Sequence, residues 1–159
     1  METTQDGFLG GRLQIYQPKT GYRAGIDPVL LAAACPAKPG EHVLELGCGV
    51  GVASLCLAAR VPEVRLHGVE ILPEYAQLAR ENAAHNNFEF EVQVGDVAAR
   101  PTPFNNSEFH QIIMNPPYFK ANASSLSPDF GRASGRAEGV ALAHWIVTAA
   151  KRLRPRGYL

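Results

Sequence analysis

The sequence predicts an α/β domain built on a mostly parallel sheet with helices on both faces. Two observations carry this prediction. Short apolar runs alternate with helical patterns from Val43 onward, and a cluster of glycines follows the first of these runs. The chain has 159 residues, the length of one domain with a hydrophobic core. With 46% hydrophobic and 19% charged residues, it is not expected to be disordered or to form a charged coiled coil.

Four segments have the pattern of buried strands in a parallel sheet. Each is a short run rich in apolar residues, and each stops at or just before a glycine, an acidic residue or an asparagine. The predicted strands cover residues 42–46, 64–70, 88–94 and 110–114.

The predicted helices begin where a proline or the end of the glycine cluster allows a first turn. Pro28 and Pro73 each suit the first helical position, and Pro36 ends the first helix. Apolar side chains at helical spacing follow these starts, and Trp145 is expected on the core side of the last helix. The predicted helices cover residues 27–35, 52–60, 73–87 and 138–153.

Two parts are expected along the chain. Residues 1–36 form an N-terminal lead-in, with a hairpin or edge strand at 8–17 and then a helix, and residues 37–159 form the core. The last helix is followed by RPRGYL at 154–159, which has the composition of a lead-in to another strand. A fourth strand without a neighbour would leave a bare apolar edge. We therefore expect a sheet that is truncated before its fifth strand.

The net charge of zero conceals a gradient along the chain. Residues 41–100 carry 4 basic and 9 acidic groups, whereas residues 101–159 carry 7 basic and 3 acidic groups. Zero net charge argues against non-specific nucleic-acid binding, which needs surplus cations. The basic last third is where a polyanion would approach.

Cysteine usage and hydropathy point to the cytoplasm. The three cysteines include no C-x-x-C pair, which speaks against a disulfide framework and against a zinc site, so no metal is expected. The first residues lack the pattern of a signal peptide, and no apolar run approaches the roughly 18 residues of a membrane helix.

The glycine cluster lies where a strand turns into a helix, between Glu45 and Val52. Gly47, Gly49 and Gly51 give the spacing G-x-G-x-G. A dinucleotide fingerprint needs its third glycine at position 52, which is Val, and the chain contains no P-loop motif. An acidic residue two positions before the first glycine resembles instead the S-adenosylmethionine loop of class I methyltransferases. A purely structural turn is the alternative.

Two more acidic residues follow at the ends of the next predicted strands. Glu70 ends the second strand, where a carboxylate can accept both ribose hydroxyls, and Asp96 follows the third, where it can accept from an adenine amine. Each alone suits a solvated strand end. Together with the glycine loop, at successive strand ends, they indicate a nucleoside-bearing cationic cofactor.

The tetrapeptide Asn-Pro-Pro-Tyr at 115–118 follows the fourth predicted strand. Consecutive prolines stiffen the backbone and can hold their neighbours in place. The Asn115 side-chain oxygen and the Pro116 carbonyl can accept the two N–H bonds of an exocyclic amine, which localises the nitrogen lone pair. Tyr118 offers a face on which a planar group stacks. An ordinary loop is the alternative.

These motifs resemble amino-methyltransferases that modify adenine N6 in nucleic acids or glutamine in release factors. The N-terminal segments FLGGRL at 8–13 and DPVLLA at 27–32 narrow the resemblance to the bacterial valine-tRNA adenine-N6 methyltransferases. That resemblance implies a Rossmann-like class I methyltransferase fold and S-adenosylmethionine as cofactor, with S-adenosylhomocysteine as product. It implies cofactor contacts from Glu45, Gly47, Gly49, Glu70 and Asp96, and target-amine contacts from Asn115, Pro116 and Tyr118.

The resemblance also implies a tRNA substrate, modified at an anticodon-loop adenine. The basic residues expected to track its phosphates are Lys120, Arg132 and Arg136, with Lys19 and Arg23 as further candidates. Three alternatives stay open: a glutamine-N5 protein methyltransferase, a guanine-N2 rRNA methyltransferase, and a non-catalytic module that binds S-adenosylmethionine or RNA.

Overall fold

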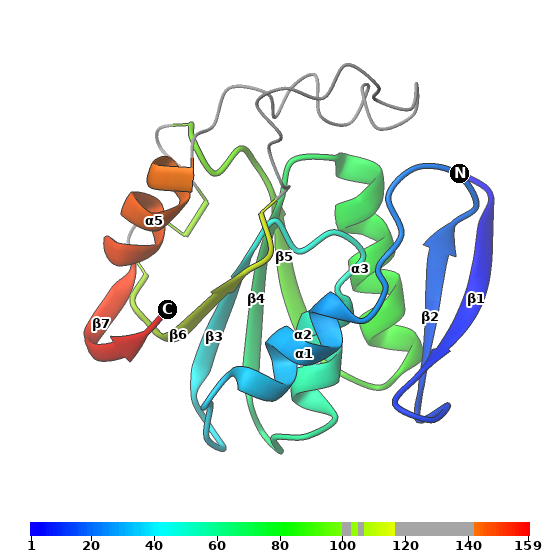
Figure 1. Ribbon diagram of the computed structural model, residues 1–159, viewed down its shortest axis with the longest axis horizontal. Helices are drawn as coiled ribbons and strands as arrows, with labels where there is room; N and C mark the ends of the chain where they lie inside the picture. Colours follow the sequence, from blue (N-terminus) through cyan, green and yellow to red (C-terminus); the bar gives the residue numbers. More distant parts are fainter. Residues whose placement is uncertain (100–102, 105–106, 117–141) are drawn as a thin grey trace.

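A computed structural model describes residues 1–99, 103–104, 107–116 and 142–159 (Figure 1). Its centre is a five-stranded parallel sheet in the order β5-β4-β3-β6-β7, and a two-stranded antiparallel hairpin stands beside it. The hairpin strands are β1 (Thr3–Phe8) and β2 (Leu13–Pro18). The sheet strands are β3 (His42–Leu46), β4 (Arg65–Glu70), β5 (Phe90–Val94), β6 (Phe109–Met114) and β7 (Leu153–Tyr158).

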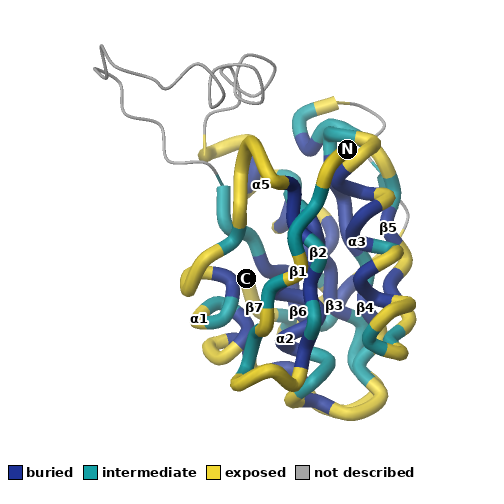
Figure 2. Tube along the Cα trace, turned by 90° about the vertical axis from the view of Figure 1, so that its right-hand side faces the viewer, coloured by how far each residue is buried: buried dark blue, intermediate teal, exposed yellow. Residues whose placement is uncertain are grey.

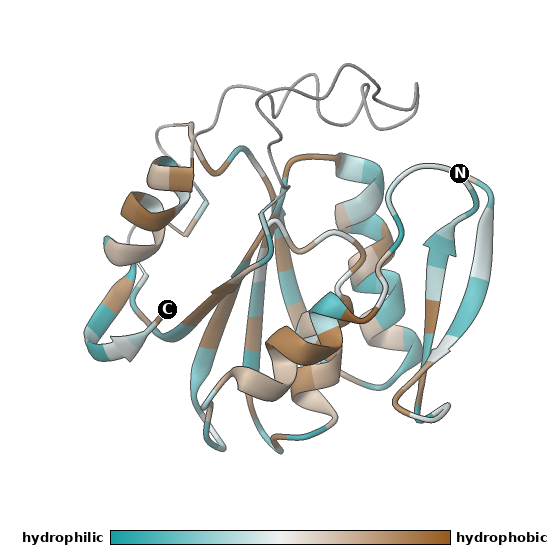
Figure 3. Cartoon of the chain, in the orientation of Figure 1, coloured by the Kyte–Doolittle hydropathy of each residue, from teal (hydrophilic) through white to brown (hydrophobic). Residues whose placement is uncertain are grey.

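Helices cover both faces of the sheet. The described helices are α1 (Asp27–Ala34), α2 (Val52–Ala58), α3 (Pro73–His85) and α5 (Leu142–Ala150). The larger apolar core joins the first three helices and β2 to one face, and a smaller core joins α5 to the other. Figure 2 shows the buried central strands between these layers, and Figure 3 shows hydrophobic residues concentrated in the sheet and in α1, α2 and α5.

Alternation along the strands explains why there are two cores. Successive side chains of a strand point to opposite faces. In β3, Val43 belongs to the larger core, whereas Leu44 and Leu46 belong to the smaller one. The fold is thus the doubly covered α/β architecture that the sequence predicts.

Two asparagines of α3 attach the hairpin to the core. Asn82 is fully buried, and its side-chain amide exchanges two hydrogen bonds with the backbone of Tyr16, at 2.8 and 3.0 Å. One turn later, Asn86 makes the same pair with Gln14, at 2.9 and 2.8 Å. The spacing of four residues on a helix matches two residues of a strand. The side chains of α3 therefore complete the free edge of β2.

The expectation that the sheet stops before its fifth strand is wrong. Leu153–Tyr158 is itself a strand, β7, which pairs with β6 through an irregular register. Pro155 lies within this strand, which an edge strand tolerates because it forms only one ladder of hydrogen bonds. The hairpin also begins earlier than expected, at Thr3. The boundary between lead-in and core at residue 36 stays a prediction.

In the described part of the chain, no helix is long and apolar enough to cross a membrane.

Candidate functional site

The parallel strands bring the predicted site residues to one edge of the sheet, which faces the upper side of Figure 1. In the sheet register, Leu46 of β3 pairs with Val69 of β4 and with Met114 of β6. The next residue of each strand therefore lies at the same level. These three neighbours are Gly47, Glu70 and Asn115.

The glycine loop at the end of β3 needs its glycines for their backbone conformation. Gly47, Gly49 and Gly51 have φ of +68°, +54° and +88°, which side chains with a Cβ rarely adopt. The Gly47 N–H donates to the Val69 carbonyl over 2.8 Å, which fixes the loop to β4. A Cβ built on Gly49 would meet nothing within 4 Å, so the loop backbone borders open space there. A ligand can approach the main chain at this point.

Glu70 ties the glycine loop to the end of β4. Its side chain is buried, and one carboxylate oxygen accepts the Gly49 N–H over 2.8 Å while the other accepts the Leu72 N–H over 2.9 Å. Burial raises the pKa of the Glu70 carboxyl, and the backbone N–H bonds counteract part of that rise.

Glu45 lies beneath the loop on the side of α2. It is 4% exposed, and its Oε2 accepts both the Ser54 N–H, over 3.0 Å, and the Ser54 hydroxyl, over 2.5 Å. Burial raises the pKa of this carboxyl to about 7; the Ser54 bonds lower it and the nearby Glu70 raises it further. Glu45 therefore braces the first turn of α2 from below the loop.

Asp96 lies one strand further along the same edge. The Glu70 carbonyl accepts the Gly95 N–H over 2.9 Å, which aligns the end of β5 with that of β4. Asp96 Oδ1 then accepts the Ala98 N–H over 2.8 Å and closes a turn. Since β4 and β3 lie between β5 and β6, Asp96 and Asn115 stand at opposite ends of a row roughly 14 Å long.

The structure places only part of the predicted target-binding segment. Asn115 and Pro116 are half-buried directly after β6, beside the glycine loop. The remaining predicted residues of this region lie outside the described residues: Tyr118, Lys120, Arg132 and Arg136.

The two candidate cations of the lead-in contact the hairpin. Lys19 pairs with Glu2 at 3.1 Å, with both side chains largely exposed. The guanidinium of Arg23 donates to the Asp6 carboxylate over 2.6 Å and to the Pro18 carbonyl over 2.7 Å. Arg23 therefore joins the segment after β2 to the hairpin, which is a structural role.

Sequence reasoning missed the residues that support the site from behind. Ser54 holds Glu45, and its only signal is a hydroxyl within an otherwise apolar helix. Cys48, within the loop, is buried, and burial holds the pKa of its thiol well above the usual value, which disfavours the thiolate form that a nucleophile needs. Among the described residues, no group of three or more His, Cys, Asp or Glu is placed to hold a metal ion.

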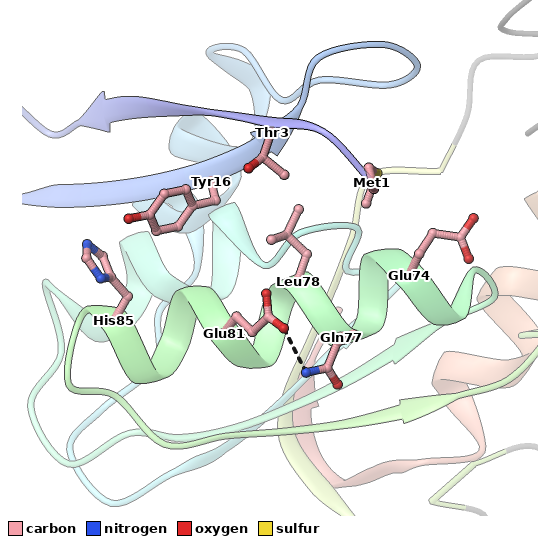
Figure 4. A pocket seen from close by; sticks show the side chains of 8 residues that line it. All are labelled: Met1, Thr3, Tyr16, Glu74, Gln77, Leu78, Glu81 and His85. Carbon is pink, nitrogen blue, oxygen red and sulfur yellow. Dashed lines mark hydrogen bonds between the residues drawn. The ribbon is translucent and has the colours of Figure 1, made fainter.

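A cavity of about 520 Å³ lies elsewhere, between the hairpin and the outer face of α3 (Figure 4). Tyr16, Leu78 and Glu81 are among the residues that line it, and Glu81 accepts a hydrogen bond from Gln77 over 2.9 Å. No predicted site residue lines this cavity, so the carboxyl edge of the sheet remains the candidate site.

Comparisons with known proteins agree with this geometry. Residues 24–159 match the family model described as methyltransferase small domain. The tRNA1(Val) (adenine(37)-N6)-methyltransferase of Porphyromonas gingivalis strain ATCC 33277 is 36% identical over 97% of this chain and 63% of its own length. The protein of the same name from Yersinia enterocolitica is 36% identical over 71% of this chain and 46% of its own. The chain thus spans less than two thirds of the length of these curated relatives.

Solved structures share the fold. TrmN from Thermus thermophilus superposes with a TM-score of 0.59 at 23% identity, over 80% of this chain and 34% of that one. A SAM-dependent methyltransferase from Geobacter sulfurreducens, solved in complex with S-adenosyl-L-homocysteine, superposes with a TM-score of 0.60. It is 19% identical, over 89% of this chain and 49% of that one.

Proposed function

The chain belongs to the methyltransferase small domain family, and from this premise we propose that it is an enzyme that transfers a methyl group from S-adenosylmethionine to N6 of an adenine in tRNA. The observation that carries the proposal is the row of Gly47, Glu70 and Asn115 at the ends of three neighbouring strands. It sets a glycine loop, a buried carboxylate and an amide side by side. The names of the two relatives support valine tRNA as the substrate.

The residues of this edge suit S-adenosylmethionine. The open space beside Gly49 admits a ligand against the loop backbone. A carboxylate offers about four acceptor sites, so the side-chain bonds of Glu70 to Gly49 and Leu72 leave sites for the ribose hydroxyls. Asp96 would accept from the adenine amine, and Glu45, behind the loop, would hold the first turn of α2 in place through its two hydrogen bonds with Ser54. Direct contacts come from Gly47, Gly49, Glu70 and Asp96 in this arrangement.

The transfer step depends on how the target amine is held. The chemistry that the bound cofactor supplies is a methyl group on a sulfonium sulfur, which departs as the thioether of S-adenosylhomocysteine. The Asn115 side-chain oxygen and the Pro116 carbonyl would accept the two N–H bonds of adenine N6, so that its lone pair points to the methyl group. The N–C bond would form as the S–C bond breaks, and the methylated nitrogen would then release one of its two protons to solvent. Positioning then supplies most of the rate enhancement.

Tyr118 would complete the target site by stacking on the adenine. Stacking of a base on an aromatic side chain contributes about 1–3 kcal/mol. Such a platform suits a base that has left its helical stack, as an enzyme acting on a base requires. Anticodon-loop adenines meet this requirement at little cost, because loop bases are already partly unstacked.

The basic stretch beyond Asn115 would face the RNA. We assign phosphate contacts to Lys120, Arg132 and Arg136, and give Lys19 and Arg23 a smaller part because both already bind hairpin groups. A tRNA substrate would place the protein in the cytoplasm.

Methylation of defined RNAs tests this function. The protein is incubated with methyl-labelled S-adenosylmethionine and unmodified valine tRNA, and the nucleosides are separated after digestion. N6-methyladenosine is expected, and valine tRNA with guanosine in place of the anticodon-loop adenines is the matched control. A release factor with a Gly-Gly-Gln loop forms the second arm. Label in that protein, and none in tRNA, would establish the glutamine-N5 alternative instead.

A further inference from the structure

The single tryptophan of the chain contacts the glycine loop from the α5 side of the sheet. Trp145 lies in α5, is 8% exposed and belongs to the smaller core with Leu44, Leu46 and Val69. Its position as a core residue agrees with the sequence prediction. What the sequence does not predict is how far its ring reaches towards the carboxyl edge.

The far edge of the indole fills the place where Gly47 would carry a side chain. A Cβ built on Gly47 would lie 2.8 Å from Cη2 and 3.1 Å from Cζ3 of Trp145. Gly47 therefore has to be glycine for two reasons, its positive φ and this contact. The loop is held from the β4 side by the Val69 carbonyl and from the α5 side by the indole ring.

The indole N–H of Trp145 adds a second observation. It is buried and has no hydrogen-bond partner within the described ranges of the chain. A buried donor without an acceptor costs stability, so phenylalanine would serve packing alone without that cost. Only the longer indole carries its outer ring atoms to Gly47.

We infer that Trp145 is a positioning residue for the cofactor loop: its ring edge holds Gly47 in the left-handed conformation that presents the loop backbone to S-adenosylmethionine. This inference rests on the proposed function. It assigns to α5, which follows the predicted target-binding segment in the chain, a direct part in cofactor affinity. The effect is on binding of the cofactor, and turnover at saturating cofactor is preserved.

Fluorescence of the wild-type protein gives the first test. Because Trp145 is the only tryptophan, all indole emission comes from the contact with the loop. Titration with S-adenosylhomocysteine is expected to change the emission, with the same midpoint as calorimetric binding. Emission that stays constant while calorimetry records saturation would overturn the inference.

Trp145→Phe gives the second test, with Phe109→Leu as its matched control. Phe109 is 1% exposed in the same core but starts β6 at the opposite edge of the sheet. Trp145→Phe is expected to weaken S-adenosylhomocysteine binding roughly tenfold, or about 1.4 kcal/mol. Phe109→Leu should lower the melting temperature at least as much and leave this affinity unchanged. In methylation assays, Trp145→Phe should raise the KM for cofactor and keep kcat.

The outcomes separate the inference from the function on which it rests. Wild-type protein that fails to bind S-adenosylhomocysteine in calorimetry contradicts the proposed function itself. Binding that is equal in wild type and Trp145→Phe, or weakened equally by both substitutions, contradicts only the role of Trp145. If Trp145→Phe does not fold, calorimetric binding to Trp145→Tyr and the emission change of the wild type test the role of Trp145.

Discussion

The two edges of the parallel sheet hold titratable groups of opposite kind, buried glutamates at one edge and half-buried histidines at the other. At the carboxyl edge, Glu45 and Glu70 lie below and beside the glycine loop. At the amino edge, the rings of His42 and His67 stack with centroids 5.2 Å apart. Burial raises the pKa of both carboxyls and lowers the pKa of both imidazoles. At both edges, burial favours the neutral form.

The edges differ in what their buried groups bind. At the carboxyl edge, the glutamates accept from Ser54 and from backbone N–H groups of the loop region. At the amino edge the imidazoles bind one another: His42 Nδ1 lies 3.1 Å from His67 Nε2, and the His42 N–H donates to the ring of His110. The imidazoles of the amino edge thus interact mainly with one another, whereas the glutamates of the carboxyl edge bind a loop backbone that borders open space.

The strongest test of this comparison uses the two ends of β6. Asn115→Ala is expected to lower methylation of valine tRNA by about 100-fold or more, the scale for loss of one group that holds the reacting centre. Binding of S-adenosylhomocysteine should stay within about twofold, because Asn115 acts on the target amine. His110→Asn, at the amino end of the same strand, is the matched control and should keep most of the activity. Radiometric assay and calorimetry measure the two quantities.

If Asn115→Ala lost cofactor affinity in proportion to activity, the assignment of Asn115 to the target amine would be wrong. If His110→Asn were as impaired as Asn115→Ala, the two edges would not differ in function.

Glu45→Gln tests the burial of the carboxylate beneath the loop. With a native pKa of about 7 and an ordinary value of 4.5, native Glu45 keeps its proton in an interval where the unfolded chain releases it. The unfolded state then binds fewer protons, so this group lowers stability as pH rises through the interval, by roughly 3 kcal/mol in all. Glu45→Gln should remove that decline. Urea unfolding between pH 4.5 and 8 measures it.

Glu89→Gln is the control for Glu45→Gln, since Glu89 is exposed. Its unfolding free energy should follow the wild-type pH profile. A wild-type profile that has the same slope as that of Glu45→Gln would contradict the buried, protonated carboxyl.

Glu70→Gln tests the carboxylate that faces the cofactor. The substitution replaces one of the two oxygens with an NH₂ group, which donates hydrogen bonds and does not accept them. The single oxygen that remains cannot accept the Gly49 N–H, the Leu72 N–H and the ribose hydroxyls together. Affinity for S-adenosylhomocysteine should fall about 10- to 100-fold, the range for a charged hydrogen-bond partner. Glu91→Gln, whose carboxylate pairs with His67 at 3.2 Å, should leave the affinity unchanged. Equal losses of affinity in the two variants would show that the loss of a negative charge, and not the position of Glu70 at the site, determines cofactor binding.

The row of site residues was predictable because parallel strands all end at one edge. A motif such as E-x-G-x-G-x-G at one strand end, together with Glu70 and Asn115 at two others, is enough to bring these residues together without knowledge of any contact. The same logic predicts the alternation of buried strands and helices on both faces.

The contacts behind the row were not predictable. Ser54 lies only nine residues from Glu45, but their contact depends on side-chain directions that no spacing rule gives. Trp145 and Gly47 lie on elements that are far apart in the sequence, and no spacing rule relates them either. The strand β7 was missed for another reason, since the composition of residues 154–159 suits the approach to a strand as well as an edge strand, and only the pairing with β6 distinguishes the two.

The smallest expected effect concerns the amino edge. Burial lowers the pKa of His67. Glu91, 3.2 Å away, raises it but does not compensate, and the neighbouring His42 and Arg65 lower it as well. Below the ordinary histidine value of 6.5, the unfolded chain takes up a proton that native His67 does not, so stability falls as pH falls. His67→Gln should reduce this loss, as urea unfolding from pH 7 to 5 would measure.

The histidine and glutamate dependences oppose each other just below pH 6.5, because Glu45 favours the lower pH and His67 the higher. The wild-type profile should therefore be flatter than that of either single variant in this interval. In Glu45→Gln, the free energy of unfolding should rise with pH, because the His67 dependence remains. In His67→Gln, it should fall with rising pH more steeply than in the wild type, because the Glu45 dependence remains. Single-variant profiles that both match the wild type would mean that neither edge buries a titrating group, and the comparison of the two edges would fail with them.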